Sequence, residues 1–392
     1  MTRRIEVIDG LRGIAILGVV WHHLFGPFTY PGFVHTGDLR HPFLPLTLLS
    51  NGWLGVNLFF VLSGFVLFWP YVTGARALAT KRDWLAYYRN RALRLLPLYY
   101  VSVAYGFLVL APPRTIEQGL RDGALMLTAT YGFTKDLWLP QYNWVLWSLG
   151  IEIWFSVLFP FVVVIARKLT IATTLAAVAC VALAVRYAGL AEMFQLKNAI
   201  YLNPMKDSVI GRLDDFVLGM FIAWLWFRSA GKSARIWSQA WVPVAGVGLI
   251  FAASHSWDYF VLRLLPATWI PLLTPVLLVG IFLVVMHVLT SGGLLSRLLR
   301  LPVLTAPGMM CYSIYIWHGV LRVQLLGPNR SPARVLLYLA AVAAVSYLSF
   351  RFIEMNRWFR PARRTVAAPV KVRKKRQPQR PREPLTDPHF RF

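Results

Sequence analysis

Charged residues are scarce in this sequence, since Asp, Glu, Lys and Arg make up 15% of its 392 residues, against about 25% in a soluble protein. Hydrophobic residues make up 57%, and several apolar runs reach about 18 residues, the length that a membrane-spanning helix needs. This composition excludes an ordinary soluble domain. Because hydrocarbon tolerates no unpaired backbone groups, the sequence predicts an all-α polytopic membrane protein.

Cysteine and acidic residues are also rare. Cys180 and Cys311 both fall in apolar segments, which excludes the disulfide framework of a small secreted domain and predicts two small core residues. No two histidines stand four residues apart near a carboxylate, so no metal site is predicted. The 16 acidic residues face 41 Lys and Arg, which gives a net charge of +25.

The excess of basic residues follows a membrane topology rather than a nucleic-acid-binding surface. About a dozen lie in the tail after the last apolar run, and most others fall in loops on alternate sides. An even number of spans puts both termini on one side, and the positive-inside rule makes that side cytoplasmic. About ten transmembrane helices are predicted, at residues 8–26, 52–71, 95–112, 144–166, 171–189, 208–227, 241–255, 268–290, 302–324 and 333–354.

Composition divides the chain into two regions. Residues 1–358 form the predicted membrane-embedded domain, in which Arg3 and Arg4 precede the first run without a signal-peptide cleavage site. Residues 359–392 are rich in Pro, Arg and Lys, which predicts a disordered cytoplasmic tail that orients the protein and rests on anionic lipid. We expect no soluble catalytic domain after the spans. The lack of an internal repeat weighs against a transporter built from duplicated halves.

The first span contains LRGIAILGVVWHHLF (11–25), an apolar stretch with an arginine and two histidines. A charge at mid-bilayer costs at least about 2.5–3.5 kcal/mol, so such groups usually face a protein interior or a wet cavity. Arg12 and His23 lie roughly 20° apart around a helix and roughly 16 Å apart along it, whereas His22 points about 80° away. Arg12 and His23 therefore share one face. The structural alternative is a snorkelling arginine plus an interior histidine held by hydrogen bonds.

The fourth span contains one carboxylate, Glu152, within NWVLWSLGIEIWF (143–155). An unpaired carboxylate in that setting would take up a proton or require a partner. Trp147 and Ser148 lie about one turn before it, so we predict a small polar cluster near mid-membrane. A purely structural polar clamp between helices is the alternative.

The ninth span contains MMCYSIYIWHGVL (309–321), in which Tyr312, Tyr315 and His318 follow one another at three-residue steps. Residues with this spacing are neighbours on one helix face. Because the span runs outward, His318 is expected at a depth similar to that of His23. An interfacial belt of Tyr, Trp and His would show the same pattern.

Arginines also stand just before the third span, in YYRNRALRLLPLYY (87–100), which we predict to be a cytoplasmic loop. Arg91 and Arg94 share a face, and two forked guanidinium groups suit phosphate. Positive-inside topology alone also explains their charge. A separate group in GRLDDFVLGM (211–220), formed by Arg212, Asp214 and Asp215, is predicted to pair internally at the lip of a span.

Taken in order, six motifs resemble those of the acyltransferase family 3 integral-membrane O-acyltransferases, over residues 5 to about 358. The first is an arginine, ten intervening residues and a histidine, here Arg12 and His23. The second is Phe-Phe-x-x-Ser-Gly, which includes Ser63. The others are RALRLLPLY (91–99), WSLGIE (147–152), YSIYIWH (312–318) and RFIE (351–354). Two departures are Asn57, where an acidic residue is common, and the Met-Asn that follows Glu354.

The resemblance implies a reaction. In such proteins the first-span histidine is essential and the arginines serve an acyl-coenzyme A donor, so Arg12, Arg91 and Arg94 are expected to hold its phosphates. His23 is expected to act as general base on an acceptor hydroxyl, and Glu152, His318 or Tyr315 to assist. Direct transfer is favoured, and an acyl-histidine or an acyl-serine on Ser63 is the minority version.

The acceptor and the membrane are expectations of the same resemblance. Acetyl is the expected acyl group, and the expected acceptor is a surface polysaccharide, a lipopolysaccharide or a lipid-linked sugar. Macrolide-like small molecules are an alternative acceptor class. The expected location is the bacterial inner membrane. The competing function is a transporter or flippase of a lipid-linked sugar or small metabolite, while a structural or sensory protein would leave the ordered histidines and arginines unexplained.

Overall fold

The computed structural model describes residues 5–25, 51–110, 115–141, 143–195, 203–229, 232–261, 266–326 and 331–356. These residues form helices, turns and bends, and no strand occurs among them. The principal helices are α1 (Glu6–Phe25), α3 (Gly55–Val72), α4 (Lys81–Tyr105), α5 (Ile116–Leu127), α6 (Leu146–Leu169), α7 (Ile171–Gln195), α8 (Leu213–Arg228), α10 (Trp241–Val261), α11 (Ile270–Thr290), α14 (Cys311–Leu325) and α15 (Pro332–Ser349). Shorter helices are α9 (Lys232–Trp237), α12 (Leu294–Leu298) and α13 (Pro302–Met309).

The fold is that of an all-α polytopic membrane protein, as predicted. Among the residues that the structure describes, seven helices are long and apolar enough to cross a membrane. Helices also lie over the other three predicted spans, where α8, α10 and the pair α13–α14 are found. The predicted tail at 359–392 and the two chain ends lie outside the described residues.

The third span begins much earlier than predicted. Helix α4 starts at Lys81 because Thr80 and Asp83 form a capping box, in which the Thr80 hydroxyl accepts from the Asp83 amide and the Asp83 carboxylate accepts from the Thr80 amide. The prediction of a loop at 87–100 is therefore wrong. Arg91 and Arg94 lie inside a continuous helix, one turn apart, rather than in front of it.

The ninth span is not one helix. It divides into α13 and α14 at Met310. Pro307 lies near the end of α13 and has no amide hydrogen to donate to the preceding turn, which favours a break at this point. Gly308 meets the backbone of α1, where an added Cβ would stand 1.8 Å from the Asp9 carbonyl oxygen. This contact anchors α13 beside α1.

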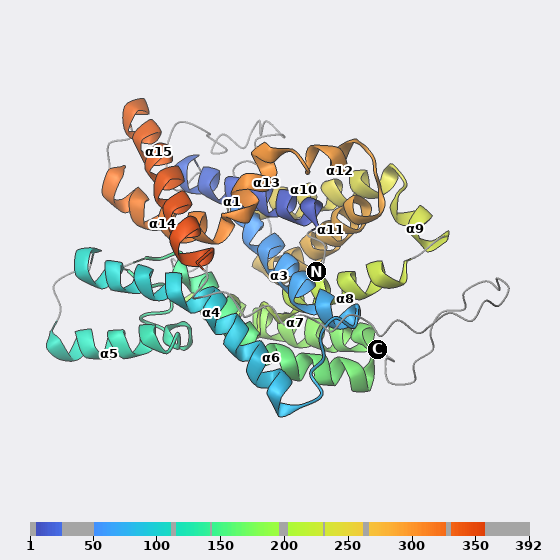
Figure 1. The fold of residues 1–392 in the computed structure, drawn as a ribbon, viewed down its shortest axis with the longest axis horizontal. Coiled ribbons are helices and arrows are strands. Elements are labelled where there is room, and N and C mark those ends of the chain that lie inside the picture. Colours follow the sequence, from blue (N-terminus) through green and yellow to red (C-terminus); the bar gives the residue numbers. More distant parts are fainter. Residues whose placement is uncertain are drawn as a thin grey trace, which may run out of the picture.

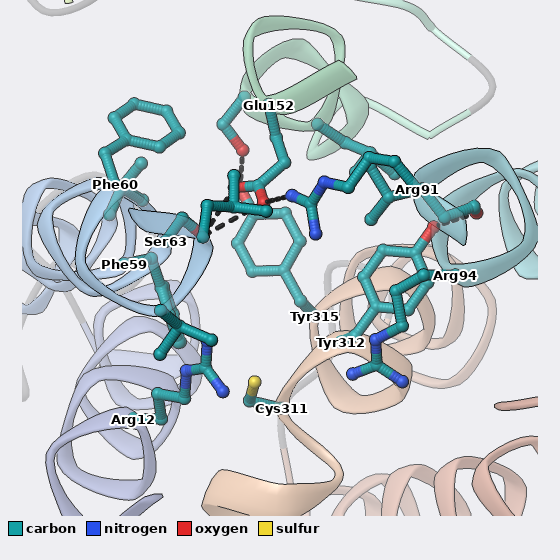
Figure 2. A pocket seen from close by; sticks show the side chains of 16 residues that line it. Arg12, Phe59, Phe60, Ser63, Arg91, Arg94, Glu152, Cys311, Tyr312 and Tyr315 are labelled. Carbon is teal, nitrogen blue, oxygen red and sulfur yellow. Dashed lines mark hydrogen bonds and ion pairs between the residues drawn. The ribbon is translucent and has the colours of Figure 1, made fainter. Parts of the chain in front are cut away.

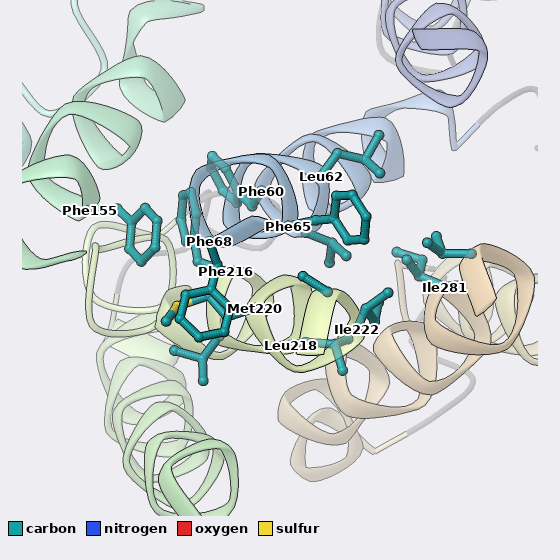
Figure 3. Close-up of a cluster of buried hydrophobic side chains, with 14 of the residues drawn as sticks. Phe60, Leu62, Phe65, Phe68, Phe155, Phe216, Leu218, Met220, Ile222 and Ile281 are labelled. Atoms are coloured by element: carbon teal, nitrogen blue, oxygen red, sulfur yellow. The ribbon is translucent and has the colours of Figure 1, made fainter. Parts of the chain in front are cut away.

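Helix α3 occupies the centre of the fold, between α1 and α8 (Figure 1). Phe60 of α3 stacks on Phe216 of α8, and Phe155 of α6 stacks on the same ring, at ring-centroid distances of 4.6 and 3.9 Å (Figure 3). These three side chains are almost fully buried. The other face of α3 is left to line a cavity, together with α1, α4, α6 and α14.

Candidate active site

A cavity of about 120 Å³ opens between five helices (Figure 2). It is mostly apolar, with a few charged and hydroxyl-bearing side chains. Its wall consists of Arg12, Val56, Phe59, Phe60, Ser63, Val66, Leu67, Arg91, Arg94, Leu95, Ser148, Leu149, Glu152, Cys311, Tyr312 and Tyr315. The cavity thus gathers residues that the sequence singled out on separate spans.

Glu152 lies in a polar cluster, but its partners come from other helices. Both carboxylate oxygens accept a hydrogen bond from the Ser63 hydroxyl at 2.9 Å, and Arg91 forms an ion pair with the same carboxylate. Arg91 also donates from Nε to the Ser156 hydroxyl at 2.8 Å. The predicted cluster is confirmed, although Trp147 is packed into the hydrophobic core and Ser148 bonds elsewhere.

Arg94 is paired as well. Its guanidinium donates to Glu354 at 2.7 Å, and the other oxygen of that carboxylate accepts from Ser313 at 2.5 Å. The Glu354 side chain is 1% exposed, so an unpaired charge would be costly at this position. The sequence noted Glu354 only as part of a motif. The reasoning applied to Glu152 was that a lone carboxylate in an apolar span needs a partner. The same reasoning applies to Glu354, which stands at the end of the last apolar span.

Arg12 differs from the other two arginines of the cavity. Within the part of the chain that the structure describes, it has neither a hydrogen-bond nor an ion-pair partner. Its guanidinium lies on one side of Cys311, and that of Arg94 lies on the other (Figure 2). Cys311 therefore borders the cavity.

The prediction of two core cysteines is wrong for Cys180, which is exposed because it lies on the outer face of α7.

Two histidines meet beside the cavity. His23 Nδ1 lies 2.9 Å from His318 Nε2, and their rings are stacked with centroids 5.1 Å apart. His318 is fully buried, and its Nδ1 lies 2.7 Å from the carbonyl oxygen of Tyr315. The indole of Trp144 packs edge-on against His23 at 4.4 Å. The prediction that His23 and His318 share a depth agrees with this contact, whereas Trp144 was not predicted.

The cavity reaches Arg12 but not His23. Its wall ends at Tyr315 and Ser148, whose hydroxyl groups lie 2.5 Å apart. The Tyr315 ring in turn lies 5.5 Å from the His318 ring. Tyr315 therefore stands between the charged cavity and the imidazole pair, so the shared helix face does not place Arg12 and His23 in one chamber.

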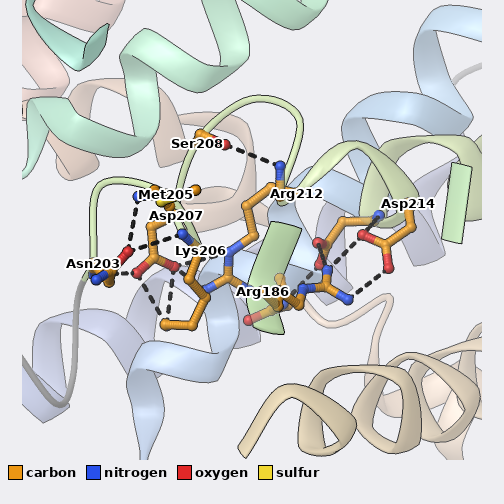
Figure 4. A network of polar contacts seen from close by, with 11 residues as sticks. Arg186, Asn203, Met205, Lys206, Asp207, Ser208, Arg212 and Asp214 are labelled. Atoms are coloured by element: carbon orange, nitrogen blue, oxygen red, sulfur yellow. Dashed lines mark hydrogen bonds and ion pairs between the residues drawn. The ribbon is translucent and has the colours of Figure 1, made fainter. Parts of the chain in front are cut away.

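A second polar network lies on the far side of α3 (Figure 4). Arg186 donates to both oxygens of Asp214, at 2.9 and 2.6 Å, and Arg212 donates from Nε to Asp207 at 3.0 Å. The predicted pairing of Arg212 with Asp214 and Asp215 is therefore wrong, because Arg212 precedes α8 and turns back toward the segment before it. Asp215 instead accepts from Asn57 at 2.7 Å.

The charges of this network are balanced. Lys206 joins it through an ion pair with Asp207 at 3.0 Å, so three cations face three carboxylates. Burial lowers the pKa of Lys206 to about 8, against the opposing effect of the Asp207 charge. The balanced charges connect α7 with α8 and the segment before it, and the Asn57 amide joins α3 to Asp215. We take the cavity on the other side of α3 as the candidate active site.

Comparison with known proteins identifies the class. Residues 5–351 match the family described as an acyltransferase domain, and the chain belongs to this family. The O-acetyltransferase OatA of Staphylococcus aureus is 25% identical over 380 residues, which cover 90% of this chain and 57% of that protein. The peptidoglycan O-acetyltransferase OatA of Listeria monocytogenes is 24% identical, with 88% and 54% covered. The chain thus spans little more than half the length of these relatives. No solved structure matches it.

Proposed function

We propose that this protein is an integral-membrane O-acyltransferase that moves an acetyl group from acetyl-coenzyme A to a hydroxyl group of a cell-wall carbohydrate. Membership of the acyltransferase family supports the reaction class. The names of two relatives, one of them a peptidoglycan O-acetyltransferase, support acetyl as the group and a carbohydrate as the acceptor. On this proposal the protein lies in a bacterial inner membrane, with the donor on the cytoplasmic side.

The observation that carries the proposal is an uncompensated guanidinium in a cavity that ends beside an imidazole pair. Arg12 supplies the guanidinium, and His23 with His318 supplies the pair. On this proposal a donor whose anionic end lies at Arg12 reaches toward Tyr315, whose ring lies 5.5 Å from that of His318. Arg12 is the group that binds a donor phosphate most directly in this proposal. A guanidinium offers forked hydrogen-bond donors, and that of Arg12, unlike those of Arg91 and Arg94, is not already paired with a carboxylate among the described residues.

Arg91 and Arg94 take a different part from the one the sequence suggested. Each already neutralises a carboxylate, Glu152 and Glu354 respectively. They add little net charge to the cavity. Their role in the proposal is to hold α4 against α6 and the end of the last span, so that the wall around the donor keeps its shape.

His23 acts as the general base in the proposed reaction. The acceptor hydroxyl loses its proton to His23, its oxygen attacks the thioester carbonyl, and the carbon–sulfur bond breaks. The leaving thiolate then takes a proton and departs as coenzyme A, while the acceptor keeps the acetyl group as an ester. Tyr315 and Ser148, at the end of the cavity, are placed to contact the acyl group.

The decisive measurement is release of free coenzyme A, together with acetyl ester formation on glycan fragments, by the purified protein in detergent. We expect His23→Ala to lose acetyl transfer altogether and to remain folded. His287→Gln is the matched control, because His287 is a buried histidine on α11 that bonds to the Trp237 carbonyl instead. Unchanged transfer in His23→Ala would refute the proposal, as would movement of a glycan carrier without coenzyme A release.

Binding of the donor is tested separately from turnover. Arg12→Gln should raise the KM for acetyl-coenzyme A by about tenfold to a hundredfold with little change in kcat, since one charge-assisted contact is lost. In a Cys180→Ser background, Cys311 is the one remaining thiol, and acetyl-coenzyme A should slow its alkylation at the cavity wall. Protection that persists in Arg12→Gln would show that Arg12 does not bind the donor.

A panel of acceptors decides the carbohydrate class. Peptidoglycan fragments are expected to be acetylated in preference to lipopolysaccharide sugars and macrolides. Preference for a macrolide would retain the acyltransferase and replace its proposed acceptor.

A further inference from the structure

We propose that His318 is a positioning residue that fixes the tautomer of His23, so that Nε2 of His23 carries the lone pair that removes the acceptor's proton. The inference rests on the proposed function for its kinetic consequence, whereas the tautomer itself is a property of the protein without substrate. It assigns the base to one named atom.

The argument begins at the backbone. His318 Nδ1 lies 2.7 Å from the Tyr315 carbonyl oxygen and 3.2 Å from that of Ile314. Carbonyl oxygens only accept hydrogen bonds, so Nδ1 of His318 must carry a hydrogen. A neutral imidazole has one N–H, and the other ring nitrogen of His318 is therefore an acceptor.

The acceptor nitrogen of His318 determines which nitrogen of His23 carries the hydrogen. His318 Nε2 lies 2.9 Å from His23 Nδ1, and two acceptors at this distance would repel each other. His23 Nδ1 therefore carries a hydrogen and donates it to His318. The remaining nitrogen of a neutral His23, Nε2, is left with a free lone pair, as a general base requires.

The same chain of contacts receives the charge that catalysis creates. When Nε2 of His23 takes the acceptor's proton, the ring becomes an imidazolium, and its Nδ1–H already points at a neutral nitrogen of His318. The hydrogen bond to His318 becomes charge-assisted and so stronger. Transfer of the Nε2 proton to the leaving thiolate restores the starting state, so no proton is gained or lost by the pair.

The surrounding packing keeps the two rings in register. Trp144 packs edge-on against His23 at 4.4 Å, with the planes 81° apart. On the other side, the Tyr338 hydroxyl donates to the His318 carbonyl oxygen at 3.2 Å and ties this turn of α14 to α15. His318 Nε2 is the ring nitrogen that contacts His23, at 2.9 Å, so its proposed role is to position the base.

Nitrogen-15 spectra of ring-labelled histidine, recorded on the full-length protein in bilayers without substrate, test the tautomer directly. The His23 signals are identified by their loss in His23→Ala. We expect wild-type His23 to be protonated at Nδ1 and bare at Nε2. His318→Gln, whose amide oxygen can replace the Nε2 acceptor, should keep this state, and His318→Leu should shift His23 toward the Nε2–H form. His287→Gln is the control that leaves His23 unchanged.

The kinetic counterpart separates positioning from binding. We expect His318→Leu to lower kcat about a hundredfold, His318→Gln to lower it much less, and neither to change the KM for acetyl-coenzyme A. A wild-type His23 protonated at Nε2, or the same tautomer in wild type and His318→Leu, would overturn the inference. If His318→Leu does not fold, the wild-type and His318→Gln spectra still decide. If no acetyl transfer is found at all, the proposed function fails while the spectra still test the tautomer.

Discussion

At the scale of single residues, the three arginines of the cavity differ in whether a carboxylate neutralises them. Arg91 and Arg94 are each paired with a glutamate, whereas Arg12 is paired with none among the described residues. The Arg91 and Glu152 side chains are each 16% exposed, and the Ser63 hydroxyl adds a further hydrogen bond to the carboxylate. Removing one partner of a buried pair leaves an unpaired charge, which costs more than losing both. Arg12 has no such partner among the described residues, so its removal should affect binding rather than folding.

A double-mutant cycle tests this difference. Arg91→Ala alone should destabilise the protein by about 3 kcal/mol, because Glu152 is then left without its cation. Arg91→Ala with Glu152→Ala should restore part of that loss. Thermal unfolding of the purified protein in detergent gives both values, and Arg12→Ala serves as the control with little effect. Additive losses in the double variant would show that Arg91 and Glu152 do not stabilise each other.

At the scale of helices, the position of the cavity depends on how closely α3 approaches α8. Gly64 and Gly219 lie at this contact, where an added Cβ would stand 1.9 Å from the carbonyl oxygens of Phe216 and Val61, respectively. No side chain fits at that distance. Because Ser63 is the neighbour of Gly64 and lines the cavity, any separation of α3 from α8 also moves the Ser63–Glu152 contact.

Alanine substitutions can therefore distinguish the cost of disturbing this helix contact from the gain in helix propensity that alanine brings. Gly64→Ala should lower stability by about 3 kcal/mol or more, since backbone atoms must move to admit the methyl group. Gly248→Ala is the matched control on α10, where nothing lies within 4 Å of the added Cβ, and it should be neutral or slightly stabilising. Size-exclusion profiles and thermal midpoints in detergent report both. Equal behaviour of the two variants would show that the close approach is unimportant.

At the scale of the whole molecule, the proposed side of donor entry depends on how the helices are oriented across the membrane. The turn that contains Arg76 joins α3 to α4, and the segment that contains Thr134 joins α5 to α6. The positive-inside rule predicts that the first lies in the cytoplasm and the second outside. Under the proposed function, we predict that the donor enters from the same side as the turn at Arg76.

Reporter fusions test the topology. Green fluorescent protein joined after Arg76 should fluoresce, and alkaline phosphatase joined after Thr134 should be active, since each folds on only one side of the membrane. The reciprocal fusions serve as controls and should be silent. Activity of alkaline phosphatase at Arg76 would reverse the orientation and with it the proposed side of the donor.

Much of the site could be predicted because helical periodicity is local. The predictions that Glu152 needs polar partners and that His318 shares the depth of His23 both follow from residue spacing, and the structure agrees with them. The start of α4 was predicted wrongly although its signal is local, since Thr80 and Asp83 have the spacing of a capping box. The partners of Arg212 were also predicted wrongly. Arg212 stands before α8, and its side chain turns back to Asp207 instead of pairing with the first residues of that helix.

The sequence by itself determined that this chain is an all-α membrane protein and that Arg12 and His23 project from one helix face, since hydrophobic length and helical period are properties of consecutive residues. Only the tertiary structure decided that Arg91 pairs with Glu152 and that His23 meets His318 rather than the cavity. Those contacts join residues 61 and 295 positions apart. They depend on which helix faces pack together, and close backbone contacts such as that at Gly64 set this packing across the whole chain.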